Sequence, residues 1–427
     1  MKDRFAIFFS TWLSAATAAI ALPGDLVEYS IIDFGANEKP FSVNVSKADN
    51  KILIAGKVDG AIGTDWLVAR LESDLRFDTT FAGVGYLTKD FMGLHDKATK
   101  IAVVDGNIMV AGASDEVVNR MTLARLLPDG TFDATFGNVA NDDGVSLHCY
   151  DISASDVLPT DLAYDGTNFW MSGSWINYGH SHDMMFGRFF ADGMPDQALG
   201  PNDGCYITGP PGALGGDRIA KISGKYPGYI TMVGSHGVTP TLYRIHANDD
   251  PNGAYMAGDP DLSFGVNGWA QDNNPLLNNA AQIRAGHAQK NGKALVAGYI
   301  VGIDAFIMRF RADGTPDPNF GVNGDGLVIF NVGLADIGQP QVIKIDKWGH
   351  IYIAGHTEVY PSSDLFIVRL NSDGSLDTTF GVGGIATTAI NAGTDYIFAI
   401  ALNSDSDVIA AGKSNGNLLV AKFQGGI

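Results

Sequence analysis

Histidines form the first set of residues in this sequence that could do chemistry. The segment Gly179-His180-Ser181-His182-Asp183 contains an H-x-H-D cluster, and on extended chain both imidazoles of such a pair can point to one side. Imidazoles arranged in this way are ligands of Zn²⁺ or Cu²⁺. A metal site and a group of polar loop histidines are both open interpretations. We favour the second and predict no metal, because no third ligand is fixed by spacing.

Aromatic side chains accompany the histidines in segments of variable length and composition. Rings of this kind stack on sugars or anchor protein partners. We therefore expect a protein or carbohydrate ligand that contacts Trp175, His180, His182, His236, Tyr299 and His356.

Acidic residues offer two further possibilities. The segment from Asp249 to Asp261 is rich in carboxylates and is the best candidate for Ca²⁺, which is the only cofactor left open here. Acids or histidines near one opening could also cleave polysaccharide as a hydrolase or lyase. Because the sequence lacks H-E-x-x-H and P-loop motifs, we favour a non-enzymatic function.

These residues lie on a repeated frame, which self-comparison reveals. An apolar strand ending in a basic residue recurs about every 59 residues, at Arg70, Arg125, Arg188, Arg244, Arg309, Arg369 and Lys422. A second strand ending in glycine precedes each one, with the glycines at Gly56, Gly112, Gly173, Gly234, Gly298, Gly355 and Gly412. The chain from residue 22 onward therefore divides into seven similar units.

The residues that follow the basic residue recur at constant offsets. Aspartate stands eight residues after it in five units, and Phe or Leu stands eleven residues after it. The constant offset predicts a charge-assisted hydrogen bond from Arg to Asp, within its hairpin or across to the neighbouring unit. The alternative is that each Asp only caps its own turn while each Arg faces water. Asp-Gly pairs, as in Asp373-Gly374, mark tight turns between the two residues.

Each unit is interpreted as four short antiparallel strands, A to D, so seven units predict an all-β, seven-bladed β-propeller formed by residues 22–427. The last unit ends after strand C, whereas the segment near Val27–Ile32 is a spare D strand. We predict that this segment pairs antiparallel with the strand near Leu418–Phe423 and closes the ring, which removes an open sheet edge.

The segment from Arg369 to Gly384, RLNSDGSLDTTFGVGG, resembles the signature of the bacterial delta-60 repeat family. The resemblance covers nearly the whole chain after residue 21; it is strongest in units one, two, five and six and weaker in three and four. It implies an exported bacterial propeller of unassigned activity, and it brings no catalytic residues.

Strand order assigns the loops to two faces. The A–B and C–D turns share one face and carry the repeated Asp-Gly pairs. The B–C and D–A loops share the other face, vary in length and carry the candidate ligand residues. Because variable loops on a repeated frame can hold specificity without disturbing packing, we place the binding surface on this second face. The alternative hydrolase or lyase would have its site at the mouth of the central channel.

Composition and the N-terminus predict where the protein works. Residues 1–21 have the charged start, apolar middle and A-x-A end of a signal peptide, so we expect an exported protein in the periplasm, at the cell surface or secreted. The formal charge of −19 argues against nucleic acid, and no later apolar run predicts membrane insertion. We expect a monomer. The sequence leaves open whether Cys149 and Cys205 form a disulfide.

Overall fold

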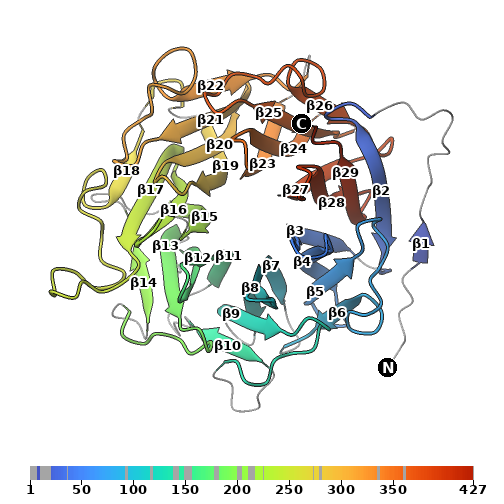
Figure 1. The fold of residues 1–427 in the computed structure, drawn as a ribbon, viewed down its shortest axis with the longest axis horizontal. Helices are drawn as coiled ribbons and strands as arrows, with labels where there is room; N and C mark the ends of the chain where they lie inside the picture. Colours follow the sequence, from blue (N-terminus) through green and yellow to red (C-terminus); the bar gives the residue numbers. More distant parts are fainter. Residues whose placement is uncertain are drawn as a thin grey trace.

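The chain folds into seven antiparallel β-sheets arranged as blades around a central axis (Figure 1). This computed structural model describes residues 7–9, 21–35, 37–91, 95–115, 119–137, 144–148, 156–176, 182–199, 204–209, 217–224, 226–272, 274–277, 281–333, 337–358 and 362–426. Within these ranges, no helix has the length and apolar character needed to cross a membrane. The predicted seven-bladed β-propeller is confirmed.

The blades follow one another along the chain, and each places its first strand nearest the axis. Blades 1 to 3 consist of β3 (Glu38–Val45), β4 (Ile52–Asp59), β5 (Thr64–Leu71) and β6 (Tyr86–Lys89); β7 (Lys97–Val104), β8 (Asn107–Asp115), β9 (Asn119–Leu126) and β10 (Val145–His148); and β11 (Asp156–Tyr164), β12 (Phe169–Ile176), β13 (His182–Phe189) and β14 (Cys205–Thr208). Blades 4 to 6 consist of β15 (Asp217–Ser223), β16 (Tyr229–His236), β17 (Thr239–His246) and β18 (Trp269–Gln271); β19 (Ala281–Ala288), β20 (Ala294–Ile300), β21 (Ala305–Phe310) and β22 (Leu327–Phe330); and β23 (Ile337–Ile345), β24 (Ile351–Glu358), β25 (Leu365–Leu370) and β26 (Ile385–Thr388).

Blade 7 joins the two ends of the chain. It contains β27 (Asp395–Leu402), β28 (Val408–Ser414) and β29 (Asn417–Phe423), followed by β2 (Leu26–Asp33) as its fourth strand. β2 runs antiparallel to β29, with Ile31 opposite Leu419 (Figure 1). The predicted closure is therefore confirmed. A short strand, β1 (Ile7–Phe9), pairs with the outer edge of β2.

The core lies between the blades. Among the described residues, buried apolar side chains form seven clusters, and each cluster joins two neighbouring blades. Ile32 and Phe34, which come from β2 and the residue after it, pack in the cluster between blades 7 and 1. The strand that closes the ring therefore also supplies core side chains.

The repeated Arg and Asp residues form a clasp between neighbouring blades. In five blades the Arg Nε–H donates to the Asp eight residues later at 2.6 or 2.7 Å. The other Asp oxygen accepts the backbone N–H two residues further along, so each Asp also caps its own turn. In each of these blades, Arg Nη1 donates to a backbone carbonyl of the following blade, at Pro128, Ala191, Ala247, Ser372 and Gly425.

The predicted Arg–Asp pairing is thus confirmed, and it works both within the blade and across to the next one. Two blades depart from it. In blade 4, where the chain carries an insertion, Arg244 and Asp261 are 4.0 Å apart and Arg244 instead donates to the carbonyls of Gly292 and Ala312. In blade 7, Lys422 replaces Arg and lies 3.6 Å from Asp407.

A β-bulge recurs at the same place in all seven inner strands. One residue of each inner strand has no partner across the ladder, and these residues are Phe41, Thr99, Thr160, Ala220, Arg284, Gln341 and Phe398. The repeated glycine of the second strand lies opposite the residue before the bulge. A Cβ on Gly412 would lie 1.7 Å from the Tyr396 carbonyl oxygen, and one on Gly355 would lie 1.9 Å from that of Gln339. The bulge therefore explains why each unit has glycine there.

Cys205, the first residue of β14, is disulfide-bonded. Cys149, the other cysteine of the chain, lies outside the described residues.

Candidate functional site

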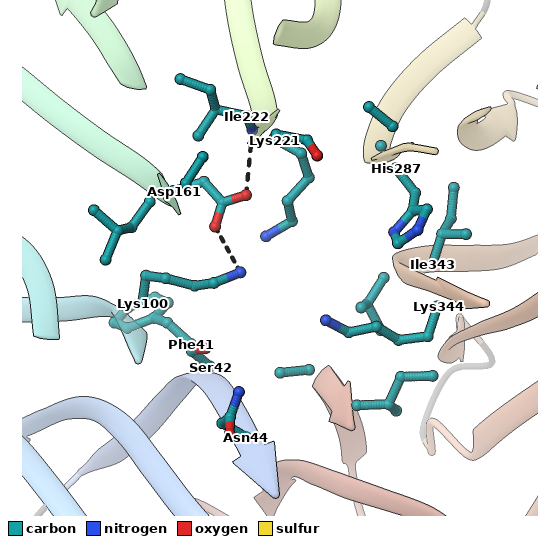
Figure 2. A pocket seen from close by; sticks show the side chains of 18 of the residues that line it. Phe41, Ser42, Asn44, Lys100, Asp161, Lys221, Ile222, His287, Ile343 and Lys344 are labelled. Atoms are coloured by element: carbon teal, nitrogen blue, oxygen red, sulfur yellow. Dashed lines mark hydrogen bonds and ion pairs between the residues drawn. The ribbon is translucent and has the colours of Figure 1, made fainter. Parts of the chain in front are cut away.

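Two adjoining cavities lie along the central axis of the ring. The first, which we call the mouth, has a volume of about 520 Å³ and lies where the inner strands begin, on the face of the B–C and D–A loops. The second, which we call the chamber, has a volume of about 320 Å³ and lies further along the inner strands (Figure 2). Phe41 and Lys221 line both cavities. The bulges turn side chains toward the axis, and Phe41, Thr99, Thr160, Arg284 and Gln341 line the mouth.

The channel is strongly basic in an acidic protein. Among the described residues that line the two cavities, the only carboxylate is Asp161, and the seven cations are Lys39, Lys57, Lys97, Lys100, Lys221, Lys344 and Arg284. Seven positive charges and one negative charge give the lining a formal charge of +6. The whole chain carries −19. A cleft lined by one sign of charge attracts and concentrates ligands of the opposite sign.

Lysines crowd one side of the mouth. Burial lowers the pKa of the Lys39 ammonium, and the positive charges of Lys57, Lys413 and Lys97 lower it further. Such mutual repulsion weakens when an anion sits among the cations. The Lys39 Nζ also lies over the Phe398 ring, 4.6 Å from its centroid, and 5.3 Å from the centroid of Phe41.

Aromatic rings continue from Phe398 to a buried histidine. The rings of Tyr396 and Phe398 are stacked with centroids 6.0 Å apart, and the His356 ring stands at 87° to Tyr396 with centroids 4.5 Å apart. Burial lowers the pKa of His356 to about 4, and the charges of Arg284 and Lys39 contribute to the lowering. His356 is therefore neutral at pH 7. Half-buried aromatic faces beside cations suit sugar rings that carry acidic groups.

The chamber gathers polar side chains from different blades. Lys100 Nζ lies 2.7 Å from Asp161 Oδ1, and the Ile222 N–H donates to Asp161 Oδ2 at 3.2 Å (Figure 2). Burial alone raises the pKa of the Asp161 carboxyl, but the charges of Lys100 and Lys221 outweigh burial and hold this pKa below its usual value. Burial lowers the pKa of the Lys221 ammonium. Asp161 thus stays ionised and holds Lys100 in place.

The residues proposed from sequence divide into three groups. Tyr299 and His356 lie near the ends of β20 and β24, and neither lines the mouth; the Nη2–H of Arg284, which does line it, donates to the Tyr299 hydroxyl at 3.4 Å. Trp175 and His236 end strands on the same face, and Trp175 packs against the apolar cluster between blades 2 and 3. His180 lies outside the described residues. His182 begins β13, and its side chain also lies outside them.

The opposite face has a structural role in the described residues. Asp129, Asp313 and Asp373 each accept the backbone N–H two residues along, at 2.9 Å, which stabilises their own turns. In the segment proposed for Ca²⁺, Asp249 and Asp250 accept N–H groups of their own loop from Ala257 and Ala254. The described residues contain no group of three or more His, Cys, Asp or Glu side chains that could hold a metal ion.

Sequence reasoning missed the cations and aromatic rings of the channel. Their signal was present but weak. Pro40, Pro159 and Pro340 stand directly before the bulge in three inner strands, and proline inside a strand often marks a bulge. Lys39, directly before Pro40, is a charged residue in a strand that would be apolar throughout if both of its faces were buried.

Four segments of the chain match the family model described as "Domain of unknown function (DUF5122) beta-propeller". The matched residues are 47–81, 105–136, 289–320 and 349–380. These segments include the four blades with a complete Arg, Asp and Phe spacing, such as Arg369, Asp377 and Phe380. These matches support a β-propeller formed of repeats. No curated protein matches the sequence.

Several solved structures resemble the chain at low identity. The β-propeller domain of the Trilobed protease from Pyrococcus furiosus is 9% identical with a TM-score of 0.43, and the match covers 91% of this chain and 96% of that one. Drosophila Semaphorin 1b is 8% identical with a TM-score of 0.45, covering 94% and 88%. Sqt1 from Chaetomium thermophilum is 10% identical with a TM-score of 0.45, covering 92% and 98%.

Proposed function

We propose that this protein is an exported, non-enzymatic binding module that holds an acidic carbohydrate at the mouth of its central channel. The observation that carries the proposal is the charge of the channel lining, with seven cations to one carboxylate in a chain of formal charge −19. A field of this sign draws in carboxylated or sulfated sugars and repels cationic molecules.

The aromatic rings favour a carbohydrate over a protein partner. Phe41 and Phe398 present half-buried rings next to Lys39, so a sugar could stack on a ring while its acidic group contacts the ammonium. A volume of about 520 Å³ is in the range of small-molecule sites. A stable protein interface needs about 800 Å² from each partner, which would extend well beyond the mouth.

The residues singled out from sequence then form the outer part of the same site. Tyr299 contacts Arg284, and the His356 ring packs edge-on with the rings of Tyr396 and Phe398. Trp175 and His236 lie at strand ends of this face, where a longer ligand would pass. We propose from the sequence that His180 and His182 contact it as well. Binding would thus begin at the mouth and extend over the variable loops.

Export and membership of the delta-60 repeat family complete the proposal. Residues 1–21 have the features of a cleaved signal peptide. The Arg, Asp, Phe and Asp-Gly spacing recurs along the chain and supports a single repeat family for all seven blades. N-terminal sequencing of the protein purified from an exporting bacterial host would test cleavage after Ala21; an uncleaved, cell-retained chain would contradict it.

A glycan array tests the binding proposal. We expect the purified protein to bind uronate-containing or sulfated oligosaccharides and to ignore neutral ones, because the channel selects by charge. The control is a chain with Lys39, Lys97 and Arg284 changed to Met, which removes three mouth cations and keeps side chains of similar length. Binding that is equal for neutral and acidic glycans, or binding only to a protein partner, would contradict the proposal.

A second candidate is a polysaccharide lyase at the same mouth. Lys39 has a lowered pKa, so its neutral form could take the proton next to a uronate carboxylate, while neighbouring cations stabilise the negative charge that develops. The glycosidic C4–O bond would then break, leaving a C4=C5 double bond, and the departing sugar oxygen would take a proton from water. Hydrolysis is less favoured, because paired carboxylates are needed and Asp161 is the only one in the described lining. Ultraviolet absorbance of an unsaturated uronate product would identify the lyase.

A further inference from the structure

We propose that the chamber is a separate binding site for one compact tetrahedral oxyanion with two negative charges, such as inorganic phosphate or sulfate. This site lies beyond the mouth along the inner strands, and the proposal does not depend on what the mouth binds.

Convergence is the first argument. Asn44, Lys100, Lys221, His287 and Lys344 come from five different blades, and their side chains point into one cavity (Figure 2). They belong to inner strands, which are the part of each blade held on both sides by neighbouring blades. A ligand in the chamber would therefore meet donors from several directions on a rigid frame, as an anion site requires.

Charge is the second argument. The described lining of the chamber has three lysines, Lys100, Lys221 and Lys344, and one carboxylate, Asp161. With a neutral histidine the formal charge is +2, which a dianion would neutralise. Excess charge of one sign in a narrow cavity is costly, and a bound counter-ion removes that cost.

The arrangement around Asp161 is the third argument. Its carboxylate lies 2.7 Å from Lys100 and accepts the Ile222 N–H, so it holds the lysine side chain in place. The positive charge of Lys221 also lowers the pKa of the Asp161 carboxyl. Asp161 is therefore a positioning residue, and its single negative charge leaves a formal charge of +2 in the chamber lining.

Size and donor type define the ligand. The chamber has a free volume of about 320 Å³, so a small anion is accommodated. Lysine ammonium groups are compact charges with three donors each, and they suit oxyanions that accept hydrogen bonds from many directions. Phosphate and sulfate share this chemistry.

Titration calorimetry of the full chain tests the site with inorganic phosphate and, separately, with inorganic sulfate, each in chloride buffer of constant ionic strength. We expect saturable binding of one anion per chain for at least one of the two, and the pair of titrations tells which is preferred. Lys344→Met should weaken binding roughly tenfold or more, since it loses a charge-assisted contact in the chamber and does not change the lining of the mouth.

Two control variants locate the anion. Lys290→Met changes an exposed lysine and Lys57→Met changes a mouth lysine, and both should leave the affinity within about twofold. Lys344→Arg keeps the charge and should retain binding, which separates loss of the site from loss of folding; thermal unfolding of each variant is measured alongside. Absence of saturable binding to both anions, or an equal loss in Lys57→Met, would overturn the proposal.

Discussion

Arg369 donates its Nε–H to Asp377 Oδ2 over 2.7 Å and spans two blades, because its Nη1 also donates to the Gly425 carbonyl in the next blade. The guanidinium carbon lies 4.8 Å from the centroid of the Phe380 ring. Arg, Asp and Phe therefore act together, which explains why their spacing recurs so regularly. The channel at the centre depends on this clasp, since the clasp sets how each blade sits against its neighbour.

Breaking one clasp should destabilise the fold. In Asp377→Asn the buried Arg369, with 2% of its side chain exposed, loses its charged partner, and we expect the free energy of unfolding to fall by about 3 kcal/mol. Urea denaturation measures the change. Asp74→Asn is the matched control, because Asp74 pairs with Arg76 at the surface; its loss should be about 0.5 kcal/mol or less. Equal effects in the two variants would contradict the clasp.

The repeated glycine should not tolerate a methyl group. In Gly412→Ala the new Cβ would lie 1.7 Å from the Tyr396 carbonyl oxygen, so the bulge of β27 has to shift. We expect a loss of about 3 kcal/mol or more in thermal or urea unfolding. In Gly302→Ala the Cβ meets open space and only the positive φ of 76° is strained, so about 1 kcal/mol is expected. A mild Gly412→Ala would mean that the bulges are not rigid.

Removing the closing strand should open the ring. A chain without residues 22–34 loses β2 and the buried Ile32 and Phe34, and it exposes the edge of β29. We expect a melting temperature lower by about 10 °C or more, with aggregation that grows with protein concentration. Differential scanning calorimetry and light scattering report the two effects. The control, a chain lacking only residues 1–21, should melt within about 2 °C of the full chain.

The buried His356 predicts how stability varies between pH 7 and pH 4. Burial lowers its pKa from 6.5 in the unfolded chain to about 4 in the folded protein. In this window the unfolded chain binds a proton that the folded protein does not, so the free energy of unfolding falls as the pH falls. The full effect of this group is about 3 kcal/mol, complete below pH 4.

His356→Gln should remove this part of the pH dependence. Urea denaturation at a series of pH values between 7 and 4 compares the variant with the wild type. The lowered pKa values of carboxyls such as Asp377 and Asp317 add losses only at lower pH, because protonation of these groups begins near and below their ordinary pKa of 3.8. Parallel profiles for the variant and the wild type would contradict the assignment to His356.

The fold was largely predictable from the sequence because its signals repeat. The equivalents of Arg369, Asp377 and Gly374 recur at fixed offsets in most units. A contact that is made in most blades requires the same residues in most repeats, so comparison of the repeats reveals it. The spare strand before Asp33 also indicated closure. The reason for the glycine at Gly412 was not predictable, because the bulge that requires it becomes visible only when strand register is known.

The site was harder to predict, because its residues do not repeat. Lys39 and Lys97 stand two residues before the bulges of their inner strands, whereas Arg284 is itself a bulge residue, so the cations share no single place in the repeat and no motif arises. The formal charge of −19 is a sum over the whole chain, so it does not show that the residues lining the channel carry the opposite sign. The variable loops predicted which face of the propeller carries the candidate site. The positive charge of the channel lining became visible only in the structure.

Titration calorimetry of acidic oligosaccharides as a function of salt tests the central claim most directly. The probes are an oligogalacturonate, its methyl-esterified form and a heparin-derived oligosaccharide, with the wild type compared to the variant in which Lys39, Lys97 and Arg284 are Met. We predict that the wild type binds at least one charged probe but not the esterified one, with affinity falling as salt screens the channel. The triple variant should lose roughly tenfold or more while keeping its melting temperature. Equal affinity for charged and esterified probes, or no binding of either charged probe, would contradict the account.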